Sequence, residues 1–481
     1  MKLVQKTFRS TAIVTTAVLG ISIHAEAANL TVNVGLNFTG STLGIDSGFI
    51  PPDTMGGVGN DHIVELINGR YSVYDKTTGT RVQTSTLDTF WTDAGVTFRE
   101  FTFDPRVLYD QNSKRWFAVA VDNARNANNF LVAVSNSSDP TLGWNGFAID
   151  SDSDDSHWAD FGTLGLNADG VFIAANMFPL VGSGVNTTIL TLPKTDLISG
   201  SVANRNLFEN INPNTTGFTL QPVVDLDNTG QPHPLFSAFN TGAGFFKRST
   251  INGLINSPTI DTTGGFIRVP PFSLPLDAEQ PGLKEKIDTG DNRISSNLVL
   301  KDGSIWGVQS VNNNDRSALR WFEIDEATNT LLQEGLIADP ELAFYYGSIA
   351  VNDSKQVAIG FSGSSENQFV SSYVAIGETI GGTTTFENPL LLKAGVDDYQ
   401  VGFSRNRWGD YSATVVDPDD PSTFWTFQEW VSGDNQWSTQ ITQLNITKPT
   451  SVPEPVSVLG LLGFGALSTL KTLKRKHNKH G

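Results

Sequence analysis

The stretch Asp160–Phe178, DFGTLGLNADGVFIAANMF, decides the fold class. Its first half alternates small and apolar residues, and its second half is a run of apolar residues. Between them lies the polar tetrapeptide Asn167-Ala-Asp-Gly170. Two short apolar runs around a polar, glycine-containing turn are typical of a β-hairpin. The stretch therefore predicts two antiparallel strands joined by a tight turn.

The same pattern occurs seven times along the chain. The other six segments are Met55–Asp75, Asp104–Asp122, Gln221–Asn240, Arg293–Val311, Tyr346–Gly363 and Gly409–Trp430. Their spacing is about 60 residues, which is enough for four strands per repeat. The fourth segment matches least well, because Pro232 and Pro234 interrupt its returning strand.

A hairpin cannot bury its apolar face alone, and repeats of this length close radially into a β-propeller. We therefore predict an all-β chain that forms a β-propeller with seven blades. Six blades, a large β-sandwich and a β-solenoid remain alternatives. If the repeated segment is the inner hairpin of each blade, its first residues gather near the axis of the propeller.

Composition excludes several classes of protein. The chain has no cysteine, so disulfides, thiolate metal sites and cysteine nucleophiles are absent. The formal net charge of −18 makes nucleic acid a poor partner. Apart from the two ends, the only histidines are His62, His157 and His233, and none lies in a known catalytic motif.

The two ends predict export. Residues 1–27 combine basic residues, the apolar stretch 11–23 and a final Ala25-Glu-Ala27, which is the pattern of a cleaved signal peptide. Residues 28–448 then form the propeller domain. Residues 449–481 contain Pro453-Glu454-Pro455, an apolar run that predicts a single transmembrane helix, and a basic end.

The C-terminal segment resembles the PEP-CTERM sorting domain, because the Pro453-Glu454-Pro455 motif, the apolar helix and the basic end occur in that order. The resemblance implies processing by a membrane enzyme of the exosortase type and a destination in the cell envelope, at the cell surface or outside the cell. It covers residues 451–481 alone, and leaves open whether the tail is cut or stays as an anchor. The body resembles secreted bacterial propellers, including the sialidase-like class, but lacks a clear Asp-box turn.

Acids and arginines at or near the starts of the seven segments are candidate ligand-binding residues of the propeller rim. They are Asp53, Asp104, Arg106, Asp160, Arg293, Arg407 and Asp410. Together, such groups can bind an anionic sugar or position a pair of carboxylates. The alternative is a structural role in turns and in ion pairs between blades.

The acidic run 150–155 is a second candidate site. Alternating aspartates in a loop can supply several oxygen ligands to calcium, although the run lacks the glycine and distal glutamate of an EF-hand. The predicted calcium ligands are Asp150, Asp152, Asp154 and Asp155.

Three hypotheses about function follow from the sequence. The first is a non-enzymatic extracellular module that binds a polysaccharide or a protein. The second is a secreted carbohydrate-active enzyme, a hydrolase or a lyase, that uses the rim aspartates and arginines. The third is an architectural protein of the envelope or biofilm.

Overall fold

The computed structural model describes residues 30–282, 284–402 and 405–448. The predicted signal peptide and the predicted sorting tail lie outside these residues. In the part of the chain that is described, no helix has the length and apolar character needed to span a bilayer.

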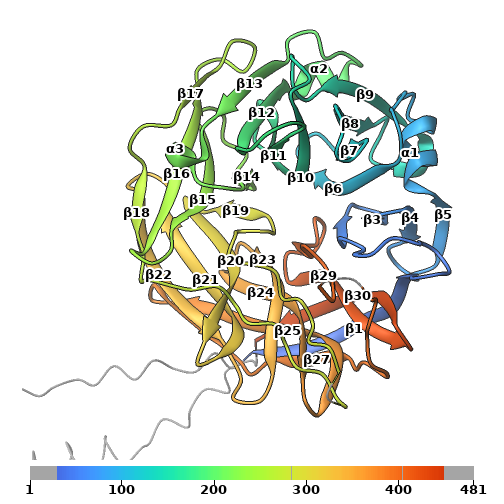
Figure 1. Ribbon diagram of the computed structural model, residues 1–481. Coiled ribbons are helices and arrows are strands. Elements are labelled where there is room, and N and C mark those ends of the chain that lie inside the picture. Colours follow the sequence, from blue (N-terminus) through green and yellow to red (C-terminus); the bar gives the residue numbers. More distant parts are fainter. Residues whose placement is uncertain (1–29, 283, 403–404, 449–481) are drawn as a thin grey trace, which may run out of the picture.

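The strands of the described residues form seven units of four or five strands each, arranged around a common axis (Figure 1). Blade 1 consists of β2 (Met55–Val58), β3 (His62–Ile67), β4 (Arg70–Asp75) and β5 (Arg81–Ser85). Blade 2 consists of β6 (Thr102–Asp110), β7 (Arg115–Asp122), β8 (Asn129–Ser135) and β9 (Trp144–Asp150). Blade 3 consists of β10 (His157–Leu166), β11 (Gly170–Pro179), β12 (Asn186–Pro193) and β13 (Asn206–Ile211).

The remaining blades follow the same order from the axis outward. Blade 4 consists of β14 (Gln221–Asp225), β15 (His233–Asn240), β16 (Phe245–Asn252), β17 (Thr259–Asp261) and β18 (Phe266–Arg268). Blade 5 consists of β19 (Leu298–Lys301), β20 (Ser304–Asn313), β21 (Arg316–Asp325) and β22 (Thr330–Ile337). Blade 6 consists of β23 (Ala343–Val351), β24 (Gln356–Ser365), β25 (Gln368–Ile380), β26 (Thr383–Phe386) and β27 (Leu390–Lys393). Blade 7 consists of β28 (Ala413–Val416), β29 (Thr423–Gly433), β30 (Gln436–Thr447) and β1 (Thr31–Thr42).

The described helices are short and lie in the connections between strands. They are α1 (Leu87–Asp93), α2 (Lys194–Ile198), α3 (Pro213–Thr216) and a 3-10 turn over Pro140–Leu142.

The seven-bladed propeller predicted from the repeats is confirmed. Each predicted segment contains the first and second strands of one blade, from β2–β3 in blade 1 to β28–β29 in blade 7. The weakest segment is also a blade: β14 pairs with β15, and Pro234 lies inside β15. The alternatives with six blades, a sandwich or a solenoid are therefore wrong.

The ring closes by joining the two ends of the described chain. β1 is the outermost strand of blade 7 and pairs antiparallel with β30, with Thr31 opposite Thr447 (Figure 1). This pairing holds the N-terminal strand in the last blade, so that the ring does not depend on packing alone.

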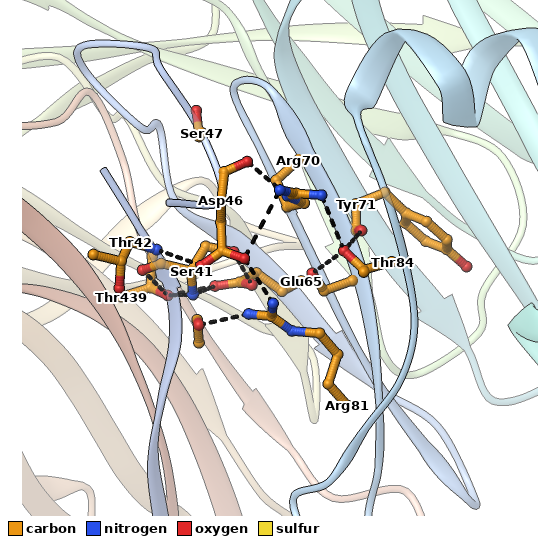
Figure 2. A network of polar contacts seen from close by, with 12 residues as sticks. Ser41, Thr42, Asp46, Ser47, Glu65, Arg70, Tyr71, Arg81, Thr84 and Thr439 are labelled. Atoms are coloured by element: carbon orange, nitrogen blue, oxygen red, sulfur yellow. Dashed lines mark hydrogen bonds and ion pairs between the residues drawn. The ribbon is translucent and has the colours of Figure 1, made fainter. Parts of the chain in front are cut away.

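A buried glutamate strengthens the contact between β1 and blade 1 (Figure 2). The carboxylate of Glu65, on β3, accepts hydrogen bonds from the hydroxyl of Ser41 at 2.6 Å and of Tyr74 at 2.8 Å, and also from Thr439. Beside it, Arg81 donates to the carboxylate of Asp46 at 2.6 Å. A buried charge needs several donors to be stable, and these come from blade 1 and from both outer strands of blade 7.

The apolar cores lie between neighbouring blades. One core joins residues of blades 1, 2 and 7, and another joins blades 2 and 3. Near the axis the blades approach closely: a Cβ on Gly165 of β10 would lie 2.5 Å from the carbonyl oxygen of Val223 on β14. Only glycine fits there, because neighbouring inner strands pair in parallel at this point.

The propeller has two unlike faces. We call the face where the inner strands β2, β6, β10, β14, β19, β23 and β28 begin the upper face, and the face where they end the lower face. Two long connections, 269–297 and 394–412, lie at the upper face, where they precede β19 and β28.

Candidate functional site

A cavity of about 160 Å³ opens at the upper face, next to the axis. Its lining is rich in charge, and we call it the charged cavity. The charged residues that line it are Asp160, Asp291, Arg293, Arg405, Arg407 and Asp410. Tyr346, Asn176 and Phe178 complete the wall on the sides of blades 6 and 3. The cavity therefore combines three guanidinium groups with three carboxyl groups.

The three arginines come from the two long connections rather than from strands. Arg293 precedes β19, and Arg405 and Arg407 precede β28. The two connections hold each other: Gln280 donates to the carbonyl oxygen of Tyr399 at 2.9 Å, and the backbone N–H of Asp288 donates to that of Asn406 at 3.1 Å. This contact fixes both sets of arginines over the same side of the axis.

Arg293 is held by Asp291. Its Nε and Nη2 donate to both oxygens of Asp291 at 2.6–2.9 Å, and its guanidinium lies over the rings of Phe161 and Phe218. Burial alone raises the pKa of Asp291, but the hydrogen bonds and charge of Arg293 lower it, so this carboxylate stays ionised. Among the described residues Nη1 of Arg293 has no hydrogen-bond partner, so a ligand can accept from it.

The other two arginines share the acids Asp288 and Asp410. Arg405 donates from Nη2 to Asp288 at 2.5 Å, and its side chain is 61% exposed. Arg407 donates from Nη2 to both oxygens of Asp410 at 2.7 Å. These pairs leave several N–H groups of each guanidinium free for a ligand, since each guanidinium carries five.

Asp160 places a carboxyl group with a raised pKa at the cavity. Burial raises its pKa well above the usual value, and the charge and hydrogen bond of the neighbouring Asp104 raise it further. A neighbouring carboxyl group disfavours the ionised form of a buried carboxyl group. A carboxyl group with a raised pKa that lines a cavity can donate a proton to a bound molecule.

Beneath the cavity lies a buried layer of charge that a ligand does not reach. Asn68 connects Asp53 with Asp104. Its amide nitrogen donates to the carboxyl group of Asp53 at 2.7 Å, and its side-chain oxygen accepts from the backbone N–H of Asp104 at 2.8 Å. Asp104 then accepts from the backbone N–H of Phe161 at 2.7 Å. Both aspartates have positive φ, near 50°, which is uncommon for a residue other than glycine. This layer links blades 1, 2 and 3 around the axis.

Arg106 is the cation of this layer. It is 1% exposed, and it donates from Nε and Nη1 to the carbonyl oxygens of Gly162 and Ser295, both at 3.0 Å. Its guanidinium lies 3.4 Å from the ring centroid of Tyr411. Burial lowers the pKa of Arg106, while the carboxyls of Asp104 and Asp53 raise it. The arginine therefore offsets the negative charge of the axis and ties blade 2 to the connection before β19.

Glu429 is a further acid of the axis. It lies on β29, is 3% exposed, and accepts from the hydroxyl of Thr54 at 2.8 Å. Burial raises its pKa to about 8, the hydrogen bonds from Thr54 lower it, and Asp410 raises it. Its second oxygen has no partner among the described residues.

The structure brings the seven predicted rim residues together but separates them into two layers. Asp160, Arg293, Arg407 and Asp410 line the charged cavity. Asp53, Asp104 and Arg106 are buried below it and are not on the rim, because the starts of β2 and β6 lie deeper than the two long connections. The structural role considered as the alternative for these residues is also seen in part, since Arg407 forms an ion pair with Asp410.

Sequence reasoning missed five residues in or beside the charged cavity and the buried layer below it: Asp288, Asp291, Tyr346, Arg405 and Glu429. Arg405 stands two residues before a predicted site residue, and Asp291-Asn-Arg293 contains another. Arg405 and Asp291 could therefore have been predicted from their closeness in the sequence to Arg407 and Arg293. Glu429 is recognisable only as an acid among the aromatic residues of β29.

The string 405–412 ties several blades together near the axis. Trp408 is fully buried in a core that includes Ile67 of blade 1 and Trp437 of blade 7, and its Nε1 donates to Ser362 of blade 6 at 3.1 Å. Tyr411 is fully buried and donates to the carbonyl oxygen of Pro105 in blade 2 at 3.0 Å. The string therefore joins four blades, more than the first and the last alone.

The acidic run is held by its own hydrogen bonds, and calcium binding there stays a prediction. In the described part of the chain, no group of three or more histidine, aspartate or glutamate side chains is arranged to hold a metal ion. Asp152 accepts from the backbone N–H groups of Ser156 and His157 at 2.8 and 2.7 Å, and Asp155 lies 3.7 Å from Arg99. Asp150 and Asp154 do not join them in one ligand set. The run is a loop stabilised by its own turn hydrogen bonds.

Comparisons with known proteins assign no family. No protein-family model matches the chain, and no curated protein matches it. The sialidase of Trypanosoma rangeli aligns at 11% identity over 92% of this chain and 63% of its own, with a TM-score of 0.36. This chain therefore spans less than two thirds of that sialidase. The WD40 domain of Toxoplasma gondii coronin aligns at 7% identity over 89% of this chain and 88% of its own, with a TM-score of 0.43. The endosialidase of phage phi92 aligns at 8% identity over 89% and 71%, with a TM-score of 0.39. These similarities are too weak to assign a function or a site residue to this chain.

Proposed function

We propose that this chain is an exported propeller that binds a carboxylated glycan in the charged cavity. The observation that carries the proposal is the convergence of Arg293, Arg405 and Arg407 on one cavity beside the axis. Arginine recognises carboxylates through its planar set of N–H donors. Asp291, Asp288 and Asp410 hold the guanidinium groups in place and leave part of each one open to a ligand.

The remaining wall of the cavity suits a sugar. Asn176, Ser310 and Tyr346 provide polar groups, and Phe178 provides an aromatic face for the apolar side of a sugar ring. The cavity of about 160 Å³ accommodates one sugar residue and leaves the rest of a polysaccharide outside.

The proposed location outside the inner membrane rests on the two ends of the sequence. The signal-peptide pattern of residues 1–27 and the resemblance of the tail to the PEP-CTERM domain both point to export and to an exosortase-type enzyme as a partner. Polysaccharides of the envelope and matrix are then the accessible ligands.

Binding of galacturonate oligomers tests this proposal, with neutral galactose oligomers of the same length as the control. Titration calorimetry is expected to show binding of the acidic oligomers alone. Arg405→Ala is expected to weaken that binding about tenfold, as the loss of one charge-assisted contact. Arg405 is largely exposed, so this variant is expected to keep its stability. Arg99→Ala, an arginine far from the cavity that lies near Asp155, is the matched control.

Equal affinity for neutral and acidic oligomers, or an unchanged affinity in Arg405→Ala, would contradict the proposed role of the arginines. Loss of binding in Arg99→Ala would show that net charge rather than the cavity attracts the glycan.

Asp160 supports a second candidate function, a carbohydrate-active enzyme. Its carboxyl group, whose pKa burial raises, lines the cavity, as a general acid does in a glycoside hydrolase or a lyase. The expected result is slow release of reducing ends from the acidic oligomers, abolished in Asp160→Asn while binding persists. The absence of any cleavage by the wild type would leave the binding function as the conclusion.

A further inference from the structure

A second cavity, of about 210 Å³, opens at the lower face of the propeller. All seven inner strands contribute their last residues to it. Aliphatic side chains form much of its wall, beside polar residues such as Asn297 and Thr414, and we call it the aliphatic hollow. The aliphatic residues that the following argument uses are Val58, Leu108, Leu166, Val224, Val299 and Val351. No residue of the charged cavity takes part in it.

The aliphatic hollow is a cavity that a small apolar group can fill. Its volume equals about seven water molecules at about 30 Å³ each. Water gains few hydrogen bonds against the valine and leucine side chains, whereas the polar side chains of the wall can still bind it. Val224 and Val299 are 8% and 6% exposed although they belong to central strands. They therefore keep apolar surface that a ligand can cover.

The mouth of the hollow is acidic. Four aspartates and one lysine line it: Asp110, Asp225, Asp353, Asp417 and Lys301. Two of these acids form ion pairs with lysines: Asp110 with Lys194 at 2.8 Å and Asp417 with Lys76 at 3.0 Å.

Asp225 and Asp227 of blade 4 and Asp353 of blade 6 leave an excess of negative charge at the mouth. Lys301 has two acids for its single charge, Asp353 at 2.5 Å and Asp227 at 3.6 Å. Asp225 accepts hydrogen bonds only from Asp227 and Thr229, and no cation lies within ion-pair distance of it in the described part of the chain. A positive group at the mouth is therefore favoured over a negative one.

We infer that the aliphatic hollow binds a small amphipathic cation, with an apolar body of six or seven heavy atoms inside the hollow and a single positive group at the acidic mouth. The apolar body replaces water against the valine and leucine side chains, and the positive group lies among Asp225, Asp353 and Asp227. This site is independent of the proposed glycan site, because the two cavities lie at opposite ends of the axis.

Three probes of equal length and different charge test this inference: hexylamine, hexanol and hexanoate. Titration of the chain, followed by chemical-shift changes of valine and leucine methyl groups, is expected to show that hexylamine binds most tightly. The expected preference over hexanoate is at least about tenfold, since two unit charges within about 8 Å at a protein surface interact by this amount. Hexanol is expected to lie between them.

Two variants locate the probe. Val299→Phe fills the hollow and is expected to weaken hexylamine and hexanol alike, by at least about tenfold, because the apolar body loses its space. Asp353→Lys reverses an exposed charge at the mouth and is expected to weaken hexylamine about fivefold without changing hexanol. Arg405→Ala in the charged cavity is expected to change neither affinity. If Val299→Phe lowers the melting temperature strongly, the comparison of hexylamine with hexanol in Asp353→Lys still decides.

Three results would overturn the inference. Equal affinities for the three probes would remove the role of the acidic mouth. Unchanged binding of hexylamine in both Val299→Phe and Asp353→Lys would place the probe elsewhere. A lack of binding by every probe at 10 mM, a concentration of roughly the order at which a ligand of seven heavy atoms is detected, would make the hollow a purely structural space.

Discussion

The two ends of the propeller axis differ in chemistry although the same seven strands build both. At the upper face the axis carries arginines and carboxyls, and its cavity is made largely by two long connections. At the lower face it carries valine and leucine, and its cavity is made by the strand ends themselves. The difference shows that the repeat supplies the scaffold, the aliphatic wall and part of the acids, whereas the two long connections supply the arginines of the charged cavity.

The largest expected effect comes from a pair of substitutions on one strand. β6 carries Arg106 near the upper end and Leu108 near the lower end. Arg106→Ala is expected to reduce the free energy of unfolding by about 3–5 kcal/mol, because buried carboxyls lose the cation that offsets them. Leu108→Ala is expected to cost about 2–3 kcal/mol, as an ordinary loss of apolar packing. Urea unfolding measures both.

The same pair distinguishes charge from packing through pH. The cost of Arg106→Ala is expected to grow as pH rises, since the buried carboxyl of Asp53, whose pKa burial raises, then ionises without a counter-charge. The cost of Leu108→Ala is expected to stay constant. Parallel pH profiles for the two variants would show that the charges of the axis are not coupled to stability.

Glu429 gives a smaller effect of defined sign. Its pKa in the folded chain is about 8, above the ordinary value of 4.5, so its protonated form contributes stability fully below pH 4.5. That stability is lost progressively as pH rises from 4.5 through 8, by on the order of 5 kcal/mol. Glu429→Gln is expected to flatten the profile of unfolding free energy in this window, whereas Glu209→Gln, on the outer strand β13, is expected to leave it unchanged. A profile of Glu429→Gln that falls like the wild type would contradict the assignment.

The smallest expected effect concerns divalent cations. Neither cavity has a set of three carboxylates arranged to hold a metal ion among the described residues, nor has the loop 150–155. Calcium at 1 mM, or its removal by a chelator, is therefore expected to shift the melting temperature by less than about 1 °C, because a ligand stabilises a fold only through a site that binds it. A larger shift in the wild type that is lost in Asp152→Asn would support the calcium hypothesis.

The fold could be predicted from the sequence because each inner hairpin repeats one local pattern. A turn such as Asn167-Ala-Asp-Gly170 and the apolar runs around it are local features, and local features are readable without alignment. Their number and spacing then fixed seven blades. The closure by β1 and β30 was not predictable, because it joins residues 400 positions apart and β1 is polar enough to be read as a linker.

The candidate site was predictable only in part, for a physical reason. Asp160, Arg293, Arg407 and Asp410 were found because they stand near the starts of repeats, which converge at the axis. The burial of each side chain could not be predicted from the sequence. The repeat spacing places Asp104 near the axis, but it does not show that Asp104 is buried. Calcium at the acidic run stays a prediction, because the acids of a loop can also accept hydrogen bonds from their own backbone, as Asp152 does from Ser156 and His157.

The pairing of Thr31 with Thr447 also sets a direction for the molecule. β30 descends toward the side where the inner strands finish, and Lys448 pairs there with Glu378 on β25. Both ends of the described chain therefore lie at the lower face, the face of the aliphatic hollow. A tether through the C-terminal segment would turn the lower face toward the anchor. The charged cavity, with its arginines, would then face the surroundings.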